Sequence, residues 1–130
     1  MYKRQLTLGS LTPCRDWGFA GDYVEAMWLM LQQENPDDYL VSTGQTHSIS
    51  DFLDIAFKHV GISEWRKYIV IDPQFKRPAE LFVLKGKNSK ARRILKWKPR
   101  VKFADLVKMM VDADIKANMD MISSYDSGMK

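Results

Sequence analysis

The chain has 130 residues, of which 45% are hydrophobic and 12% aromatic, so it can form one domain but is short for a two-domain enzyme. Its formal charge of +4 comes mostly from a basic block between Lys85 and Lys102. A single cysteine, Cys14, excludes an intrachain disulfide and a cysteine metal cluster, which favours a reducing, cytoplasmic setting. No apolar run is long enough to cross a bilayer, so we expect no membrane partner.

The first five residues, Met1 to Gln5, have two explanations. They match a sequencing-adaptor end translated as protein, since GTG TAT AAG AGA CAG gives this sequence with an initiating methionine. They are equally explained as a genuine N-terminus, which is too polar for the core of a signal peptide. We expect residues 1–5 to be a non-native or disordered end, residues 6–120 to form the domain, and residues 121–130 to be a frayed tail.

The first predicted elements are a short strand at 6–8 and a helix at 19–31. Apolar residues recur at helical spacing in the second of these, which predicts a helix with one buried face. A short apolar run at 39–43, closed by Gly44, predicts a buried strand in a mixed or parallel sheet. The apolar stripe of the helix comprises Phe19, Tyr23, Met27, Met30 and Leu31, widened by Val24 and Trp28.

Helices and strands continue to alternate in the second half of the chain. A helix begins after Ser48, where Asp51 completes a capping box, and ends at Gly61. The run at 68–72 predicts a strand. This alternation indicates an α/β (α+β-like) fold. The remaining predicted elements are a basic helix capped by Ser89 and ending at Leu95, and a last helix at 103–119 whose buried face comprises Phe103, Leu106, Val107, Met110, Val111 and Ile115.

The turn from Arg15 to Phe19 runs directly into the first long helix. An arginine ahead of a helix N-terminus predicts an anion site, because the guanidinium and the unpaired backbone N–H groups can point at one ligand. An ordinary capped helix explains the same pattern, and periodicity alone favours that explanation.

Several catalytic patterns are missing from the chain. The close glycines Gly18 and Gly21 form neither the dinucleotide fingerprint nor the phosphate loop of nucleotide triphosphatases. No tyrosine is followed four residues later by lysine, so the catalytic pair of short-chain oxidoreductases is absent. His47 and His59 lack partners at metal-ligand spacing, and we assign neither a role. We predict no catalytic, cofactor-binding or metal-binding residue, and whether the chain alone is an enzyme stays open.

The basic block contains nine lysines and arginines and no acidic residue. Nucleic acid is the obvious partner to consider for such a charge excess. However, Trp97 is the only aromatic residue in the block, whereas a single-strand binder interleaves several stacking rings. We therefore favour a solvated helix face without nucleic acid, with phosphate binding at the helix start as a secondary role. A small basic module for nucleic acid or another polyanion remains the alternative.

Seven short motifs together resemble the C-terminal part of the GDP-mannose 4,6-dehydratase family, within the extended short-chain dehydrogenase/reductase superfamily. The resemblance covers the chain from about Leu6 to about Met119. R-D-W-G followed by D-Y-V-E-A-M-W is quite specific to this family, whereas R-P-A-E and W-K-P are shared with other sugar-nucleotide enzymes. The motifs are L-G-S at 8–10, R-D-W-G at 15–18, D-Y-V-E-A-M-W-L-M-L at 22–31, T-G at 43–44, R-P-A-E at 77–80, S-K-A at 89–91 and W-K-P at 97–99.

The resemblance implies a lyase that uses NADP to convert GDP-mannose to GDP-4-keto-6-deoxy-mannose, toward GDP-fucose and other deoxysugars. In the family an N-terminal Rossmann domain holds NADP and the catalytic residues, and the C-terminal domain holds the nucleotide sugar. This chain is then the C-terminal substrate-binding part, with the Rossmann core largely missing and no cofactor bound by the chain alone. Met27, Trp28 and Met30 could contact the missing domain, although core packing is the favoured explanation.

The resemblance also implies partners for the chain. These are GDP-mannose or a related GDP-sugar, and the missing Rossmann domain or a complementary chain; the full-length family is oligomeric. A truncated gene product and a stand-alone subunit are both compatible with the sequence. By position in the motifs, Arg15 and Arg77 would grip the diphosphate from two sides and Glu80 would accept from the ribose hydroxyls. Ser10 replaces the family's asparagine at a sugar-nucleotide contact, which weakens that contact.

The same residues have purely structural explanations. Arg15 could pair with Asp16 or Asp22, and Arg77 could simply begin a loop. The chain also departs from the family where Phe19 replaces the histidine that commonly follows R-D-W-G. These departures affect the expected substrate contacts more than the family resemblance.

Overall fold

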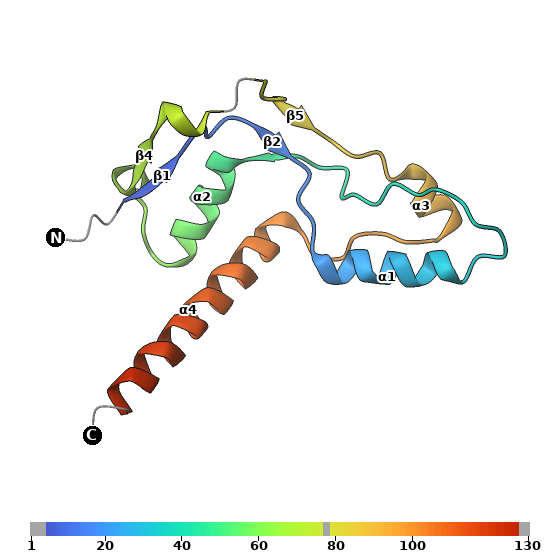
Figure 1. The fold of residues 1–130 in the computed structure, drawn as a ribbon. Coiled ribbons are helices and arrows are strands. Elements are labelled where there is room, and N and C mark those ends of the chain that lie inside the picture. The colour runs from blue at the N-terminus through green and yellow to red at the C-terminus, as the bar shows by residue number, and fades with distance from the viewer. Residues whose placement is uncertain (1–4, 77–78, 128–130) are drawn as a thin grey trace.

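The computed structural model describes residues 5–76 and 79–127, with side chains to residue 120. In Figure 1, β1, β4 and α2 lie at one end, α1 and α3 lie at the other, and α4 runs away from both. The helices are α1 (Ala20–Leu31), α2 (Ile49–His59), α3 (Ser89–Ile94) and α4 (Phe103–Ser127), with 3-10 turns at Trp65–Tyr68 and Pro73–Phe75. The strands are β1 (Leu6–Leu8), β2 (Cys14–Arg15), β3 (His47–Ser48), β4 (Ile69–Ile71) and β5 (Val83–Leu84).

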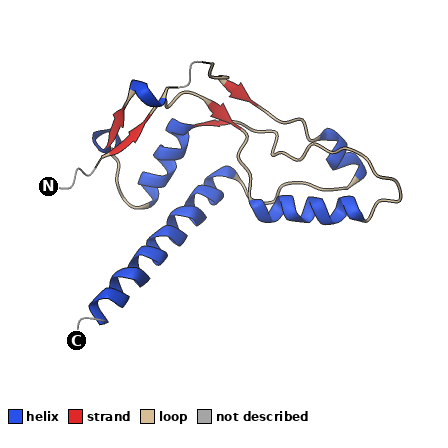
Figure 2. Ribbon diagram, viewed as in Figure 1, coloured by secondary structure: helices blue, strands red, loops and turns tan. Residues whose placement is uncertain are grey.

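The strands form two small sheets (Figure 2). β1 pairs in parallel with β4, and Leu8 lies opposite Ile71. β2 is the centre of a three-stranded sheet, antiparallel to β3 and parallel to β5. Parallel pairing requires a long crossover, and here it brings residues 14–15 beside residues 83–84. The predicted strands at 6–8 and 68–72 are confirmed, although the second is shortened to 69–71.

The inner face of α1 packs on the main core of the chain. Ala26 is fully buried, and Tyr23 and Met30 pack partly buried beside it. The core is completed by side chains from α3 and the loop after it, namely Ala91, Leu95 and Trp97. The predicted helix is confirmed, but its predicted buried stripe is partly wrong.

The outer face of α1 is uncovered. Met27 is 60% exposed and Trp28 is 59% exposed, and Val24 and Leu31 are also exposed. Met27, Trp28 and Met30 were expected to pack in the core, and only Met30 does so. The reason is geometric, because the chain covers only the side of the helix that carries Tyr23, Ala26 and Met30.

The predicted buried strand at 39–43 is wrong within this chain. The segment is extended but pairs with no strand of the part of the chain that the structure describes, and Leu40 is 54% exposed. Side chains satisfy two of its backbone groups, since the Ser42 carbonyl accepts from Asn88 Nδ2 at 2.7 Å and the Thr43 N–H donates to the Asp16 carboxylate at 2.8 Å. An apolar run forms a strand only where a neighbouring strand supplies hydrogen-bond partners.

α2 begins as predicted. Ser48 accepts from the Asp51 N–H, and the Asp51 carboxylate accepts from the Ser48 N–H, which together form a capping box. The helix ends before Gly61, which has a φ of +80° that favours glycine. α2 packs against α4, and His59 Nε2 lies 2.6 Å from a carboxylate oxygen of Asp112.

Two predicted helix boundaries are wrong. Ser89 is the first residue of α3 rather than its cap, because Asn88 takes the cap position. α4 continues past the predicted end at Met119 to Ser127. Phe103 and Val107 on its predicted face are buried, but Met110 is exposed. Within the described ranges, no helix combines the length and apolarity that crossing a membrane requires.

Candidate functional site

Three of the four predicted site residues line one cavity. Ser10, Arg15 and Glu80 surround a space of about 240 Å³, although Arg15 and Glu80 are 65 positions apart in the chain. The fold brings them together because β2, which contains Arg15, lies beside β5, which follows the segment of Glu80. The other lining residues are Leu8, Gly9, Pro13, Ile49 and Phe75.

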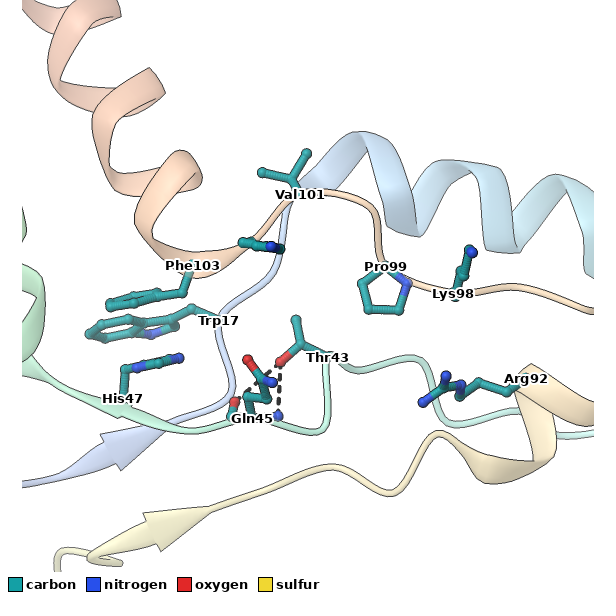
Figure 3. Close-up of a pocket in the computed structure, with 10 residues that line it drawn as sticks. Trp17, Thr43, Gln45, His47, Arg92, Lys98, Pro99, Val101 and Phe103 are labelled. Carbon is teal, nitrogen blue, oxygen red and sulfur yellow. Dashed lines mark hydrogen bonds between the residues drawn. The ribbon is translucent and has the colours of Figure 1, made fainter.

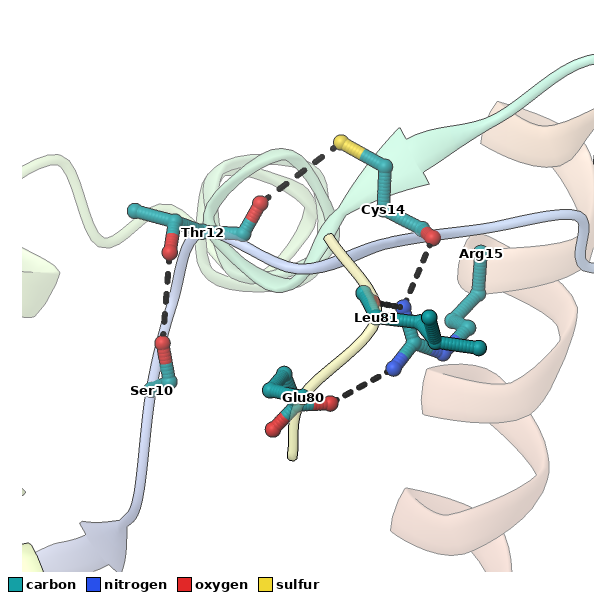
Figure 4. A network of polar contacts seen from close by, with 6 residues as sticks. All are labelled: Ser10, Thr12, Cys14, Arg15, Glu80 and Leu81. Atoms are coloured by element: carbon teal, nitrogen blue, oxygen red, sulfur yellow. Dashed lines mark hydrogen bonds and ion pairs between the residues drawn. The ribbon is translucent and has the colours of Figure 1, made fainter. Parts of the chain in front are cut away.

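The guanidinium of Arg15 is held in a fixed orientation. Its Nη2 donates to Glu80 Oε1 at 2.6 Å, and both side chains are mostly buried, at 23% and 20% exposed (Figure 4). Its Nη1 donates to the carbonyls of Leu81 at 2.8 Å and Cys14 at 2.9 Å. Two backbone acceptors and one carboxylate therefore fix the fork of the arginine at the cavity.

Arg15 does not form the two alternative pairs that the sequence allowed. Its carboxylate partner is Glu80, not Asp16 or Asp22. It also points toward Leu81 rather than to the N-terminus of α1, so the predicted combined site of arginine and helix end is not formed. Asp22, in the first turn of α1, is buried and accepts from the backbone N–H groups of Arg100 and Val101.

Asp16 connects three separate segments of the chain. Its carboxylate accepts from the Thr43 N–H and hydroxyl, from the Gly44 N–H at 2.8 Å and from the Gly86 N–H at 3.2 Å. Burial raises the pKa of Asp16, but these hydrogen bonds together outweigh burial and hold the pKa below its ordinary value. The second residue of R-D-W-G is therefore a structural joint that positions β2 and Arg15.

The fourth predicted site residue, Arg77, was expected as the second diphosphate ligand and lies outside the described residues. Ser10 lies at the cavity and its hydroxyl is 3.3 Å from that of Thr12. Gly9 is required at the cavity wall, because a Cβ there would lie 2.3 Å from the Phe75 carbonyl oxygen. Sequence reasoning missed Phe75 as a wall residue, and only its place shortly before R-P-A-E hints at it.

Comparison with known proteins identifies relatives of this chain. A family model described as GDP-mannose 4,6 dehydratase matches residues 1–110. GDP-mannose 4,6 dehydratase 2 of Arabidopsis thaliana is 56% identical over 112 residues, which are 86% of this chain and 30% of the relative. GDP-mannose 4,6 dehydratase of Homo sapiens is 40% identical over 126 residues, 85% of this chain and 34% of the relative. The chain thus spans about a third of the length of these curated relatives.

Solved structures share the fold at low sequence identity. A UDP-glucose 4-epimerase from Thermotoga maritima, solved with UDP-glucose, has a TM-score of 0.75 at 19% identity, covering 87% of this chain and 35% of that one. A dTDP-glucose 4,6-dehydratase from Bacillus anthracis, in complex with NAD, has a TM-score of 0.72 at 16% identity, covering 83% and 33%. This likeness shows the fold, and it agrees with the predicted α/β class.

Proposed function

We propose that this chain, which belongs to the GDP-mannose 4,6-dehydratase family, forms the part of the enzyme that holds the diphosphate and ribose of a GDP-sugar. The observation that supports this proposal most is the convergence of Ser10, Arg15 and Glu80 on one cavity. Arg77, the first residue of the R-P-A-E motif, is the second proposed diphosphate ligand through the family resemblance. Two arginines acting on one diphosphate suit the geometry of guanidinium groups.

Binding of the GDP-sugar would replace one hydrogen-bond partner of Arg15 with another. Without a nucleotide, Nη2 of Arg15 and the Glu80 carboxylate neutralise each other. A diphosphate would take the place of Glu80 on the guanidinium, while the carbonyls of Leu81 and Cys14 keep Nη1 in position. The released Glu80 carboxylate would then accept hydrogen bonds from ribose hydroxyls.

The dehydration itself is assigned to the rest of the full-length protein. The sequence contains no glycine-rich turn that fits NADP and no tyrosine–lysine pair, so we derive no step of hydride transfer or elimination from these residues. For the whole protein we propose the family reaction, with NADP held outside this chain. The chain alone would bind the GDP-sugar without converting it.

The uncovered apolar surface of α1 suits contact with that remaining part. Val24, Met27, Trp28 and Leu31 are exposed along the outer face of the helix, and Leu40 is exposed on the unpaired extended segment. The chain spans about a third of its curated relatives, so the remainder of the protein is the proposed occupant. Apolar surfaces of this kind are typical of protein contacts.

Calorimetric titration with GDP and with guanosine tests the proposed site. Arg15→Gln should weaken GDP binding about tenfold or more, because a hydrogen bond to a charged group contributes about 1.5–3 kcal/mol. Guanosine has no diphosphate, so we expect it to bind more weakly than GDP. Arg15→Gln should not change its affinity. The matched control is Arg93→Gln, which removes the same charge from an exposed arginine that lines none of the cavities described here.

The proposed site would be refuted if Arg15→Gln and Arg93→Gln lowered the GDP affinity equally. Conversion of GDP-mannose by the purified chain supplied with NADP would refute the division of labour instead. The two results are independent, so each half of the proposal can fail alone.

A further inference from the structure

A second cavity, of about 230 Å³, lies between α3, the loop after it and the start of α4 (Figure 3). It shares no lining residue with the cavity of Ser10, Arg15 and Glu80. Three cationic side chains line it, namely Arg92 from α3 and Lys98 and Lys102 from the loop before α4. No acidic residue is among the described side chains of its wall. The wall therefore favours a negatively charged ligand.

These three cations have no acidic partner in the part of the chain that the structure describes. Two other members of the basic block do, since Lys90 pairs with Asp37 at 2.5 Å and Arg100 pairs with Glu25. Three formal positive charges thus face one space without a carboxylate to neutralise them.

The wall nearest α2 contains an unsatisfied polar atom. His47 Nε2 is buried and has no hydrogen-bond partner among the described residues. Its ring stacks on Phe103 with 3.9 Å between centroids and 5° between planes. Buried polar atoms nearly always have a partner, and a ligand oxygen would accept a hydrogen bond from Nε2–H once the ring slides along Phe103 toward the cavity.

The start of α4 adds to the positive character of the cavity. Phe103, the first residue of this 25-residue helix, lines the space, so the positive end of the helix dipole lies beside it. Phe103 also stacks on Trp17, which together with Pro99 and Val101 gives the cavity an apolar side. The site combines a cationic wall with rings that could contact an organic group.

We propose that this cavity binds a small anion of the phosphate class, either inorganic phosphate or the phosphate group of a small ester. The cationic side chains and His47 Nε2 would hold the phosphate oxygens, and Phe103 and Trp17 would contact the organic part of an ester. The site is separate from the proposed GDP-sugar cavity. A nucleic-acid strand would instead engage the exposed cations along the whole block.

The test is titration of the isotope-labelled chain with inorganic phosphate and with phenyl phosphate, followed by amide and indole NMR shifts. Saturable shifts are expected at Trp17, His47 and Phe103, and tighter binding of phenyl phosphate would identify an ester as the ligand. Arg92→Gln should lower the affinity for phosphate about tenfold or more. The adjacent Arg93→Gln should change this affinity less than about twofold. Lys98→Gln has Lys96→Gln as its matched control.

His47→Phe keeps a ring against Phe103 and removes Nε2, so it should weaken phosphate binding while the dispersion of the spectrum stays unchanged. Arg15→Gln should leave phosphate binding at this cavity unaltered, which separates this inference from the GDP-sugar proposal. Equal losses in Arg92→Gln and Arg93→Gln, shifts that never saturate at millimolar phosphate, or shifts that disappear with Arg15→Gln would each overturn the inference.

Discussion

The two sides of α1 differ in how completely their groups are paired. On the inner side, the Asp22 carboxylate accepts hydrogen bonds from two backbone N–H groups. The backbone carbonyl of Asp22 accepts from Trp97 Nε1 at 2.7 Å. On the outer side, Met27 and Trp28 are more than half exposed. The chain is therefore held together by a few well-satisfied polar joints between distant segments, while much apolar surface has no cover within it.

This difference separates the side of α1 that the chain itself stabilises from the side that we propose contacts a partner. The joints at Asp16 and Asp22 fix the turn that begins with Arg15, and so they fix one wall of the proposed GDP-sugar cavity. The outer face of α1 contributes to neither cavity. Substitutions on the two sides should consequently have very different effects.

The largest effect is expected for Asp22→Ala. Asp22 is 5% exposed, and its removal leaves the N–H groups of Arg100 and Val101 without their acceptor. Both hydrogen bonds are part-buried, and each group left unsatisfied costs about 1–3 kcal/mol, so the free energy of unfolding should fall by about 3 kcal/mol. Urea unfolding followed by circular dichroism measures this change.

Asp38→Ala is the control for that substitution, because Asp38 is exposed and surface changes usually stay within about 0.5 kcal/mol. A similarly small change for Asp22→Ala would show that the inner side of α1 is not held by this joint. The contrast between the two faces would then be lost.

A smaller, pH-dependent effect is expected at Asp16. Its pKa lies below the ordinary value in the folded chain, so its carboxylate adds stability above the unfolded pKa, and this is lost as pH falls through the folded pKa. Asp16→Asn should cost about 1–3 kcal/mol at neutral pH, because the amide NH₂ faces N–H donors. The difference between the two proteins should shrink as unfolding is measured from pH 7 toward pH 3. A constant difference across this range would contradict the assignment of the joint to the ionised carboxylate.

The sequence predicted best the features that depend on neighbouring residues. The capping box of Ser48 and Asp51, the strand at 6–8 and the span of α1 follow from short-range chemistry, and all are confirmed. The segment at 39–43 has a strand's composition, but a strand needs a pairing neighbour that no local pattern reveals. The two-residue strands β2, β3 and β5 are too short to leave a pattern.

The candidate site depended on the fold in the same way. The family resemblance supplied Ser10, Arg15 and Glu80, but no spacing predicts that residues 65 positions apart share a cavity. The pairing of β2 with β5 supplies that contact. The cavity of Arg92 and Lys102 could not be predicted from the sequence either, because its wall includes His47 from a strand distant in the chain.

The smallest effect on stability is expected on the outer face of α1, where Met27→Gln and Met30→Gln form a matched pair. Met27 is 60% exposed, so its substitution should change the free energy of unfolding by less than about 0.5 kcal/mol. Met30 packs against the core of Ala26 and Trp97, so its substitution should cost about 1–2 kcal/mol. Urea unfolding of both variants gives the comparison.

The same pair distinguishes an open face from a covered one. Fluorescence of a dye that binds apolar surface should fall for Met27→Gln and for Trp28→Gln, because both remove exposed apolar area from the purified chain. If Met27→Gln destabilised the chain as much as Met30→Gln, the outer face would be buried in solution, for instance by a second copy. Unequal costs together with reduced dye binding would instead leave that face open for the proposed contact with a remaining part of the protein.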